Sequence, residues 1–196
     1  MKRKAAITLL SVVFIIALSG CGSKSAVNTI GPWDTSDQQA GAVIEILSTG
    51  GLSAFAGFQV DETYQSAKMG VEYYQDGKLV KDEAQGAIAL EETSQGIAGF
   101  NSVDGTATIG LSVNGDTGSA SDIQLTDYPV KEGDNISVTS ISETRDIADG
   151  QKIYLGALSD GNDSLDTSAL DVSSDKENLV GKNWLFYVVF STEPLE

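Results

Sequence analysis

The sequence predicts a mainly β fold, an antiparallel β-sandwich-like single domain. Short apolar segments separated by Gly, Asn and Asp recur from residue 55 onward, which is the spacing typical of sandwiches and open barrels. Ala107 to Val113 alternates apolar residues with Thr108, Gly110 and Ser112, and so predicts a strand with one face in the core and one in water. Val71 to Asp82 has the pattern of a hairpin.

The first 20 residues have the layout of a secretory signal peptide. A basic head at residues 2–4 precedes an apolar run, residues 5–18, that is too short to cross a bilayer. The run ends in Leu18-Ser19-Gly20-Cys21, which resembles the lipobox of bacterial lipoproteins. This resemblance implies cleavage after Gly20, lipid attachment at Cys21 and a place on the extracytoplasmic face of the bacterial cell membrane. The alternatives are an uncleaved signal anchor or an ordinary cleavage site beside an incidental cysteine.

Residues 21–33 are expected to form the lipidated N-terminus and a flexible tether, because residues 22–32 are mostly small and polar. The β-rich extracytoplasmic domain is then expected to span residues 34–196. Trp33 stands at the boundary, where a tryptophan more often packs as a lid on the core than serves as a platform for a ligand.

Residues 36–48 contain the one candidate helix. Ser36 stands three residues before Gln39, as in a capping box, and apolar residues follow at helical spacing. Gly41 and several β-branched residues weaken the helix, so a strand from Ala42 to Ser48 is the alternative.

The hairpin is expected to turn at Asp76-Gly77, a pair that readily adopts the positive φ angles of a type I′ turn. The expected pairs are Gln75 with Lys78, Tyr74 with Leu79, Tyr73 with Val80 and Glu72 with Lys81. This register places the apolar side chains on one face and the opposite charges of Glu72 and Lys81 on the other.

Further short strands are expected near Ile123, from Ile136 to Ile141 and from Lys152 to Leu158. The segment from Trp184 to Phe190 is apolar throughout and lacks alternation. Such a strand must be covered on both faces, which predicts a central position in its sheet.

The loop from Asp160 to Asp171 has the densest run of oxygen ligands. Asp160, Asn162, Ser164 and Asp166 follow an EF-hand-like spacing, but Leu165 stands where that motif needs glycine and the last position is Asp rather than Glu. We therefore expect a solvated polar loop and no metal site, with calcium binding as the alternative.

The composition excludes several classes of function. Loss of residues 1–20 removes three of the 12 basic residues and none of the 28 acidic ones, which leaves nine basic residues and a net charge of −19. Such an acidic chain is unsuited to binding nucleic acid. It also repels anionic lipid headgroups, so membrane contact is expected through the acyl chains on Cys21 alone. The absence of histidine excludes His-based catalytic triads and His-ligated zinc.

We therefore expect a lipid-anchored surface protein with a non-catalytic binding or structural role and no cofactor. The first alternative is a carbohydrate- or solute-binding module, in which exposed aromatic residues would line one concave face. The candidates for that face are Trp33, Tyr73, Tyr74 and Tyr128. The second alternative is a hydrolase that uses two carboxylates across a cleft, for which Glu91-Glu92 and Asp82-Glu83 are the adjacent acidic pairs.

Overall fold

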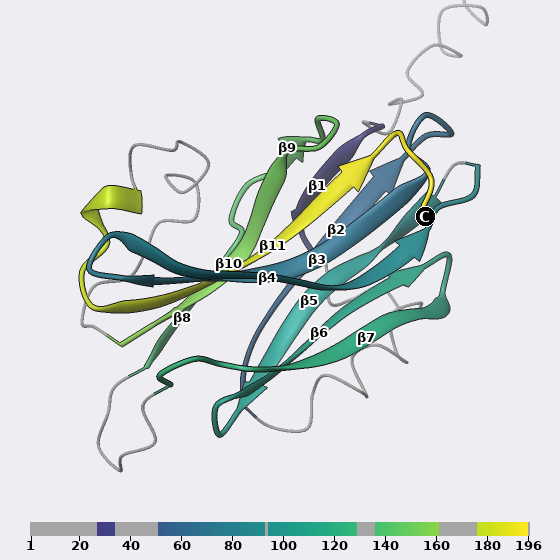
Figure 1. Ribbon diagram of the computed structural model, residues 1–196. Coiled ribbons are helices and arrows are strands. Elements are labelled where there is room, and N and C mark those ends of the chain that lie inside the picture. The colour runs from purple at the N-terminus through teal and green to yellow at the C-terminus, as the bar shows by residue number, and fades with distance from the viewer. Residues whose placement is uncertain (1–26, 34–50, 93, 129–135, 161–175, 196) are drawn as a thin grey trace, which may run out of the picture.

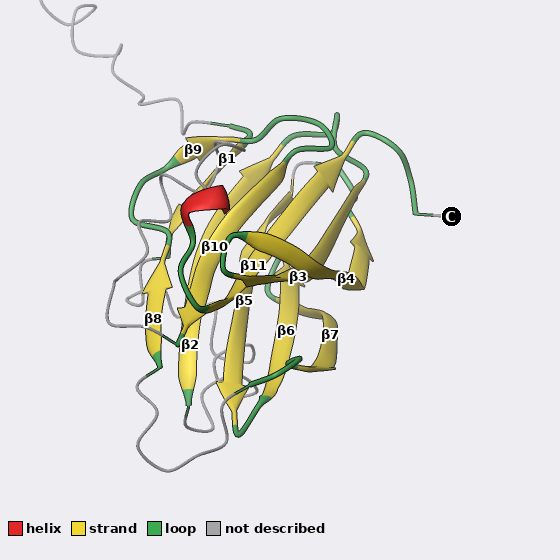
Figure 2. Ribbon diagram, turned by 60° about the vertical axis from the view of Figure 1, so that its left-hand side comes forward, coloured by secondary structure: helices red, strands yellow, loops and turns green. Residues whose placement is uncertain are grey.

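Two antiparallel β-sheets pack face to face (Figures 1 and 2). A computed structural model describes residues 27–33, 51–92, 94–128, 136–160 and 176–195. The six-stranded sheet runs in the order β7 (Asp116–Gln124), β6 (Thr106–Val113), β5 (Ser94–Val103), β2 (Leu52–Val60), β1 (Thr29–Pro32) and β9 (Arg145–Asp146). The five-stranded sheet runs in the order β4 (Lys78–Ala89), β3 (Ser66–Gln75), β11 (Lys182–Ser191), β10 (Lys152–Ser159) and β8 (Ser137–Ser140). The predicted mainly β, sandwich-like fold is confirmed.

The core lies between the sheets and is built from the alternating inward side chains of each strand. Ala107, Ile109 and Leu111 of β6 are all buried, as the alternation predicts. Their outward-facing neighbour Ser112 is also buried, at 5% exposure, so the outer face of this strand is less exposed to solvent than expected. Phe100 of β5 stacks on Phe186 of β11 with ring centroids 3.7 Å apart, which ties the two sheets together.

β11 occupies the centre of the five-stranded sheet, as its apolar sequence predicts. Trp184, Phe186 and Val188 belong to the core between the sheets. Leu185 and Tyr187 face the other way and form a second, smaller apolar cluster on the outer face. One turn of 3₁₀ helix, η4 (Lys176–Asn178), precedes β11 and is drawn in red in Figure 2, and Leu179 just after it is buried in that second cluster.

The β3–β4 hairpin turns at Asp76 and Gly77, whose φ angles are +48° and +74°. The predicted turn and the pairs Gln75–Lys78 and Tyr74–Leu79 are therefore confirmed. Beyond them the register is not the expected one, because Tyr73 lies opposite Lys81 and Glu72 opposite Asp82. A β-bulge at Val80 adds one residue to β4, leaves Val80 54% exposed and separates Glu72 from Lys81.

β1 begins at Thr29, within the stretch expected to be a tether. It pairs with β2 on one side and with β9 on the other, and Ile30 is 1% exposed in the core. This short, mostly polar segment thus joins the sheet through its backbone hydrogen bonds and one buried isoleucine. The domain therefore starts before the expected boundary at residue 34.

Three of the sequence-based interpretations lie outside the described residues: the lipobox with Cys21, the helix or strand at 36–48, and the part of the acidic loop between 161 and 171. Within the described part of the chain, no helix is long and apolar enough to span a membrane.

Candidate functional site

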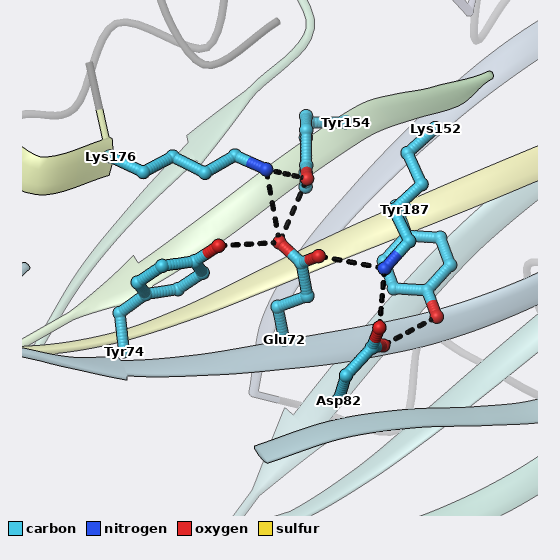
Figure 3. Close-up of polar contacts among 7 residues, drawn as sticks. All are labelled: Glu72, Tyr74, Asp82, Lys152, Tyr154, Lys176 and Tyr187. Atoms are coloured by element: carbon cyan, nitrogen blue, oxygen red, sulfur yellow. Dashed lines mark hydrogen bonds and ion pairs between the residues drawn. The ribbon is translucent and has the colours of Figure 1, made fainter. Parts of the chain in front are cut away.

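A buried carboxylate, Glu72 of β3, organises a polar cluster on the outer face of the five-stranded sheet (Figure 3). The residue is only 4% exposed. Its Oε1 accepts a hydrogen bond from Lys152 Nζ at 2.7 Å. Its Oε2 accepts hydrogen bonds from the hydroxyls of Tyr154 at 2.8 Å and Tyr74 at 3.2 Å, and from Lys176 Nζ at 3.2 Å. Both carboxylate oxygens therefore accept hydrogen bonds, one at Oε1 and three at Oε2.

A second carboxylate, Asp82 of β4, extends the cluster. It accepts hydrogen bonds from Lys152 Nζ at 2.6 Å and from the Tyr187 hydroxyl at 2.8 Å. Lys152 thus bridges Glu72 and Asp82, and its ammonium lies 4.1 Å from the centroid of the Tyr187 ring. Two lysines and two carboxylates balance one another in charge, which is the condition for burying ionised groups.

Lys176 connects the chain before β11 to this cluster. Its ammonium donates to Glu72 and to the Tyr154 hydroxyl, and it lies 4.3 Å from the centroid of the Tyr154 ring. Because Lys176 belongs to η4, these contacts hold the helical turn against the outer face of the sheet.

The cluster assembles residues that are distant in sequence, and sequence reasoning did not identify it. The signal that could have found it is the alternation in β3 and β10, where Glu72-x-Tyr74 and Lys152-x-Tyr154 each place a charged residue and a tyrosine on one face. Strand β11 lies between β3 and β10, and its apolar outer face has to be covered by side chains from these neighbouring strands.

The protonation states of the cluster favour a structural role. Burial raises the pKa of Glu72, but the hydrogen bonds from Lys152 and Tyr154 and the charge of Lys176 outweigh burial, and the pKa lies below its ordinary value. The pKa of Asp82 is likewise lowered, because the contacts with Lys152 and Tyr187 outweigh its burial. A catalytic general acid needs a raised pKa, and neither carboxyl group has one.

These shifts predict how stability depends on pH. Glu72 and Asp82 bind protons less readily in the folded state, so their contribution is present above the ordinary pKa of about 4 and is lost as the pH falls below it. Burial raises the pKa of Tyr74 and of Tyr187 to about 12. The folded protein therefore keeps protons that the unfolded chain releases above about pH 10, and stability also falls from there towards pH 12. Urea midpoints measured from pH 3 to pH 11 test both limbs, and an unchanged midpoint between pH 7 and pH 3 would contradict the ionised cluster.

A second feature is a groove on the outer face of the six-stranded sheet, with a volume of about 270 Å³. Gly31 of β1 and Gly57 of β2 lie opposite each other on its floor. Their neighbours Ile30, Ala56 and Phe58 point into the core, so the two glycines face outward. We call this feature, lined also by Trp33, Gln59, Gln95 and Thr144, the glycine groove.

The walls of the glycine groove depend on its glycines. A Cβ atom at Gly57 would lie 3.4 Å from Cδ1 of Trp33, so the indole packs directly over this position. The indole of Trp33 also makes an edge-to-face contact with the ring of Phe55, with ring centroids 6.1 Å apart and an interplanar angle of 69°. A Cβ atom at Gly31 would lie 2.6 Å from Oγ1 of Thr144, so only glycine allows the loop at Thr144 to approach β1.

Among the described residues that line the glycine groove, none is Asp, Glu, Lys or Arg. This is informative in a chain with 28 acidic and 12 basic residues. Its polar side chains are instead the amides of Gln59 and Gln95 and the hydroxyls of Thr29, Ser112 and Thr144, all of which can both donate and accept hydrogen bonds.

The four candidate aromatic residues do not line one concave face. Tyr73 is 2% exposed and stacks on Trp184 in the core, with ring centroids 5.5 Å apart. Tyr128 packs against the same tryptophan at 5.3 Å. Tyr74 belongs to the Glu72 cluster on the five-stranded sheet, so Trp33 alone of the four reaches the glycine groove.

The adjacent acidic pairs do not converge across a cleft. Asp82 belongs to the Glu72 cluster, whereas Glu83 forms an ion pair with Lys81 at 2.5 Å. Glu91 and Glu92 are both exposed at the start of the turn before β5.

The acidic loop is described only at its first residue. Asp160 Oδ1 accepts a hydrogen bond from the backbone of Lys182 at 2.7 Å, which fixes the end of β10 against the start of β11. Among the described residues, no group of three or more acidic or cysteine side chains is placed to hold a metal ion.

Comparison with protein families gives a match over most of the chain. The YgaN domain family matches residues 30–189, from β1 to β11, and so covers both sheets and the two features described above. No curated protein and no solved structure matches the chain. Because the matched region spans well over half of the sequence, the chain belongs to the YgaN domain family.

Proposed function

We propose that this protein is anchored to the extracytoplasmic face of the cell membrane by lipid on Cys21 and binds a small uncharged ligand without transforming it. The observation that carries the binding role is the glycine groove, a cavity of about 270 Å³ with an aromatic wall and, in the described part of the chain, no ionisable lining residue. Ligand pockets combine apolar or aromatic walls with a few polar groups in this way.

The arrangement of charged groups supports a non-catalytic role. The two carboxylates that do come together, Glu72 and Asp82, have their oxygens occupied by lysine and tyrosine donors and pKa values below the ordinary range. They neutralise Lys152 and Lys176 and hold η4 in place. The glycine groove lies on the opposite sheet, and its described lining residues include neither an acid nor a base of the usual catalytic kinds.

The anchoring rests on Leu18-Ser19-Gly20-Cys21 and on the apolar run before it. Two acyl chains on one cysteine hold a protein stably at a membrane, each buried CH₂ contributing about 0.8 kcal/mol. A net charge of −19 after cleavage repels anionic headgroups, so the folded domain itself is expected to stay off the membrane surface.

Cys21→Ala is expected to abolish incorporation of a labelled fatty acid and to leave an uncleaved precursor, because the thiol that accepts the lipid is lost. The measurement is metabolic labelling followed by detergent partitioning of cells that express each form. Ser23→Ala, two residues further on, is the control and should label and partition as the parent does. Equal labelling of the Cys21→Ala variant and the parent would refute the anchor.

A further inference from the structure

We infer that the ligand of the glycine groove is a neutral saccharide, with one face of a sugar ring stacked on Trp33 and its hydroxyl or acetamido groups hydrogen-bonded to Gln59, Gln95 and Thr144. This inference rests on the proposed function and names the chemical class that its site would take. Three observations carry it: the charge of the lining, the kind of polar group, and the position of the aromatic ring.

The lining selects against charged ligands. An anion or cation buried in the groove would find no Lys, Arg, Asp or Glu partner among the lining residues that the structure describes, and burying an unpaired charge is costly. The strongly negative chain would in addition repel anions. A neutral ligand meets neither penalty.

The polar groups match the hydrogen-bonding needs of a sugar. Each hydroxyl of a sugar both donates and accepts, and so does each glutamine amide and each threonine hydroxyl. Within the described part of the chain, no hydrogen bond engages the side-chain amide of Gln59 or the hydroxyl of Thr144. Gln95 is positioned by its backbone, whose N–H donates to Asn114 Oδ1 at 3.1 Å and whose carbonyl oxygen accepts from the Asn114 N–H at 2.7 Å.

The aromatic ring supplies a flat apolar surface over a floor that has no side chains. Trp33 packs over Gly57 and is braced by Phe55, so the ring is held in one orientation. The C–H groups on one face of a sugar ring pack well against such a surface. A volume of about 270 Å³ lies just below the usual range for ligand pockets, about 300–1,000 Å³, and so favours one or two sugar units.

An extended peptide is the less suitable occupant. Peptides that bind to sheets usually add a strand at a free edge, through backbone hydrogen bonds. β1, which forms one side of the groove, already pairs with β2 and with β9. The groove therefore offers side chains and glycine Cα surface rather than an open strand edge.

The chain carries its own reporter for this test, because it has two tryptophans in different surroundings. Trp184 is 1% exposed in the core, whereas Trp33 is partly exposed at the groove. The probes are N-acetylglucosamine, its β-1,4-linked dimer, glucose and maltose, with glucuronic acid and an uncharged, capped tripeptide for comparison. Binding is followed by tryptophan emission and by protection of Trp33 from acrylamide quenching.

At least one of the four neutral saccharides is expected to change the emission saturably, and glucuronic acid is expected to bind at least about tenfold more weakly than glucose. Trp33→Ala should remove the response and weaken calorimetric binding by about tenfold or more, the usual scale for a lost stacking contact. Gly57→Val should do the same by filling the floor, since a β-branched residue suits the strand but meets the indole. Gln59→Ala should also weaken binding, because it removes an amide that lines the groove. Gln124→Ala removes an exposed amide on β7, is the matched control and should leave binding unchanged.

Each other outcome has a definite meaning. Binding of the tripeptide through the groove, abolished by Gly57→Val, with none by the saccharides, would overturn the saccharide inference and leave the proposed binding role standing. Saccharide binding that survives both Trp33→Ala and Gly57→Val in folded protein would overturn the assignment of the site. Absence of binding by every probe would overturn the inference and the proposed binding role together, while the anchoring test at Cys21 remains separate.

Discussion

Glu72→Gln is expected to lower the free energy of unfolding by about 3 kcal/mol or more, the scale for removing one partner of a buried ion pair. The amide cannot compensate Lys152 and Lys176, and in either orientation its NH₂ group faces a donor, either Lys152 or the three donors that now converge on Oε2. The side chain of Glu72 is 6% exposed and that of Lys176 is 17% exposed, so water cannot replace the lost carboxylate easily. Urea denaturation at pH 7, with unchanged m-values, gives the difference.

The matched control is Glu83→Gln on the neighbouring strand. Glu83 also pairs with a lysine, but the side chains of Lys81 and Glu83 are 47% and 25% exposed. An exposed pair of this kind contributes between about 0 and 1 kcal/mol. If Glu72→Gln costs no more than Glu83→Gln, the cluster is not a stabilising element of the outer face.

Gly77→Ala is expected to destabilise the domain by about 3 kcal/mol, whereas Gly115→Ala is expected to cost only about 1 kcal/mol. Both glycines have positive φ, +74° and +82°, so both variants carry the cost of a left-handed conformation, about 1–2 kcal/mol. Only at Gly77 would the new Cβ atom meet another segment, 2.3 Å from the carbonyl oxygen of Glu177 in η4, because nothing lies within 4 Å at Gly115.

The extra cost at Gly77 comes from moving η4 away from the hairpin. The turn and the chain after η4 are joined by two hydrogen bonds, from Asp76 N to the Gly181 carbonyl at 2.9 Å and from Gly181 N to Asp76 Oδ1 at 3.0 Å. Each contributes on the order of 1 kcal/mol. Equal losses for the two variants, measured by thermal and urea unfolding, would mean that η4 does not pack on the turn.

The local features of the fold could be predicted from the sequence because their causes are local. Asp76-Gly77 specifies its own turn, and the unbroken apolar run from Trp184 to Phe190 specifies a strand covered on both faces. The bulge at Val80 could not be predicted, because it depends on the fit of β4 to β3 rather than on either sequence. Because of that extra residue, Glu72 lies opposite Asp82 rather than the predicted Lys81. Its ion pairs are instead with Lys152 and Lys176 of other segments.

The two candidate sites could be predicted only in fragments, for the same reason. Trp33 is conspicuous in the sequence, but its position over Gly57 follows from the register of β1 with β2. Thr144 carries no sequence signal at all, and reaches the groove because Gly31 leaves room for it. The Glu72 cluster depends likewise on how β3, β10 and β11 are ordered in one sheet.

The central position of β11 has a consequence for how the chain folds. β3 and β4 can form their hairpin early, but β3 finds its other neighbour only in β11, and the bonded pair Asp82 and Tyr187 is separated by 105 positions. Pairings of such long range make folding slow, because the entropy of closing the loop is lost before the stabilising contacts can form. Until β11 is in place, β3 and β10 each expose an unpaired edge and the core lacks Trp184 and Phe186, so the polypeptide has to be kept from aggregating until β11 is available.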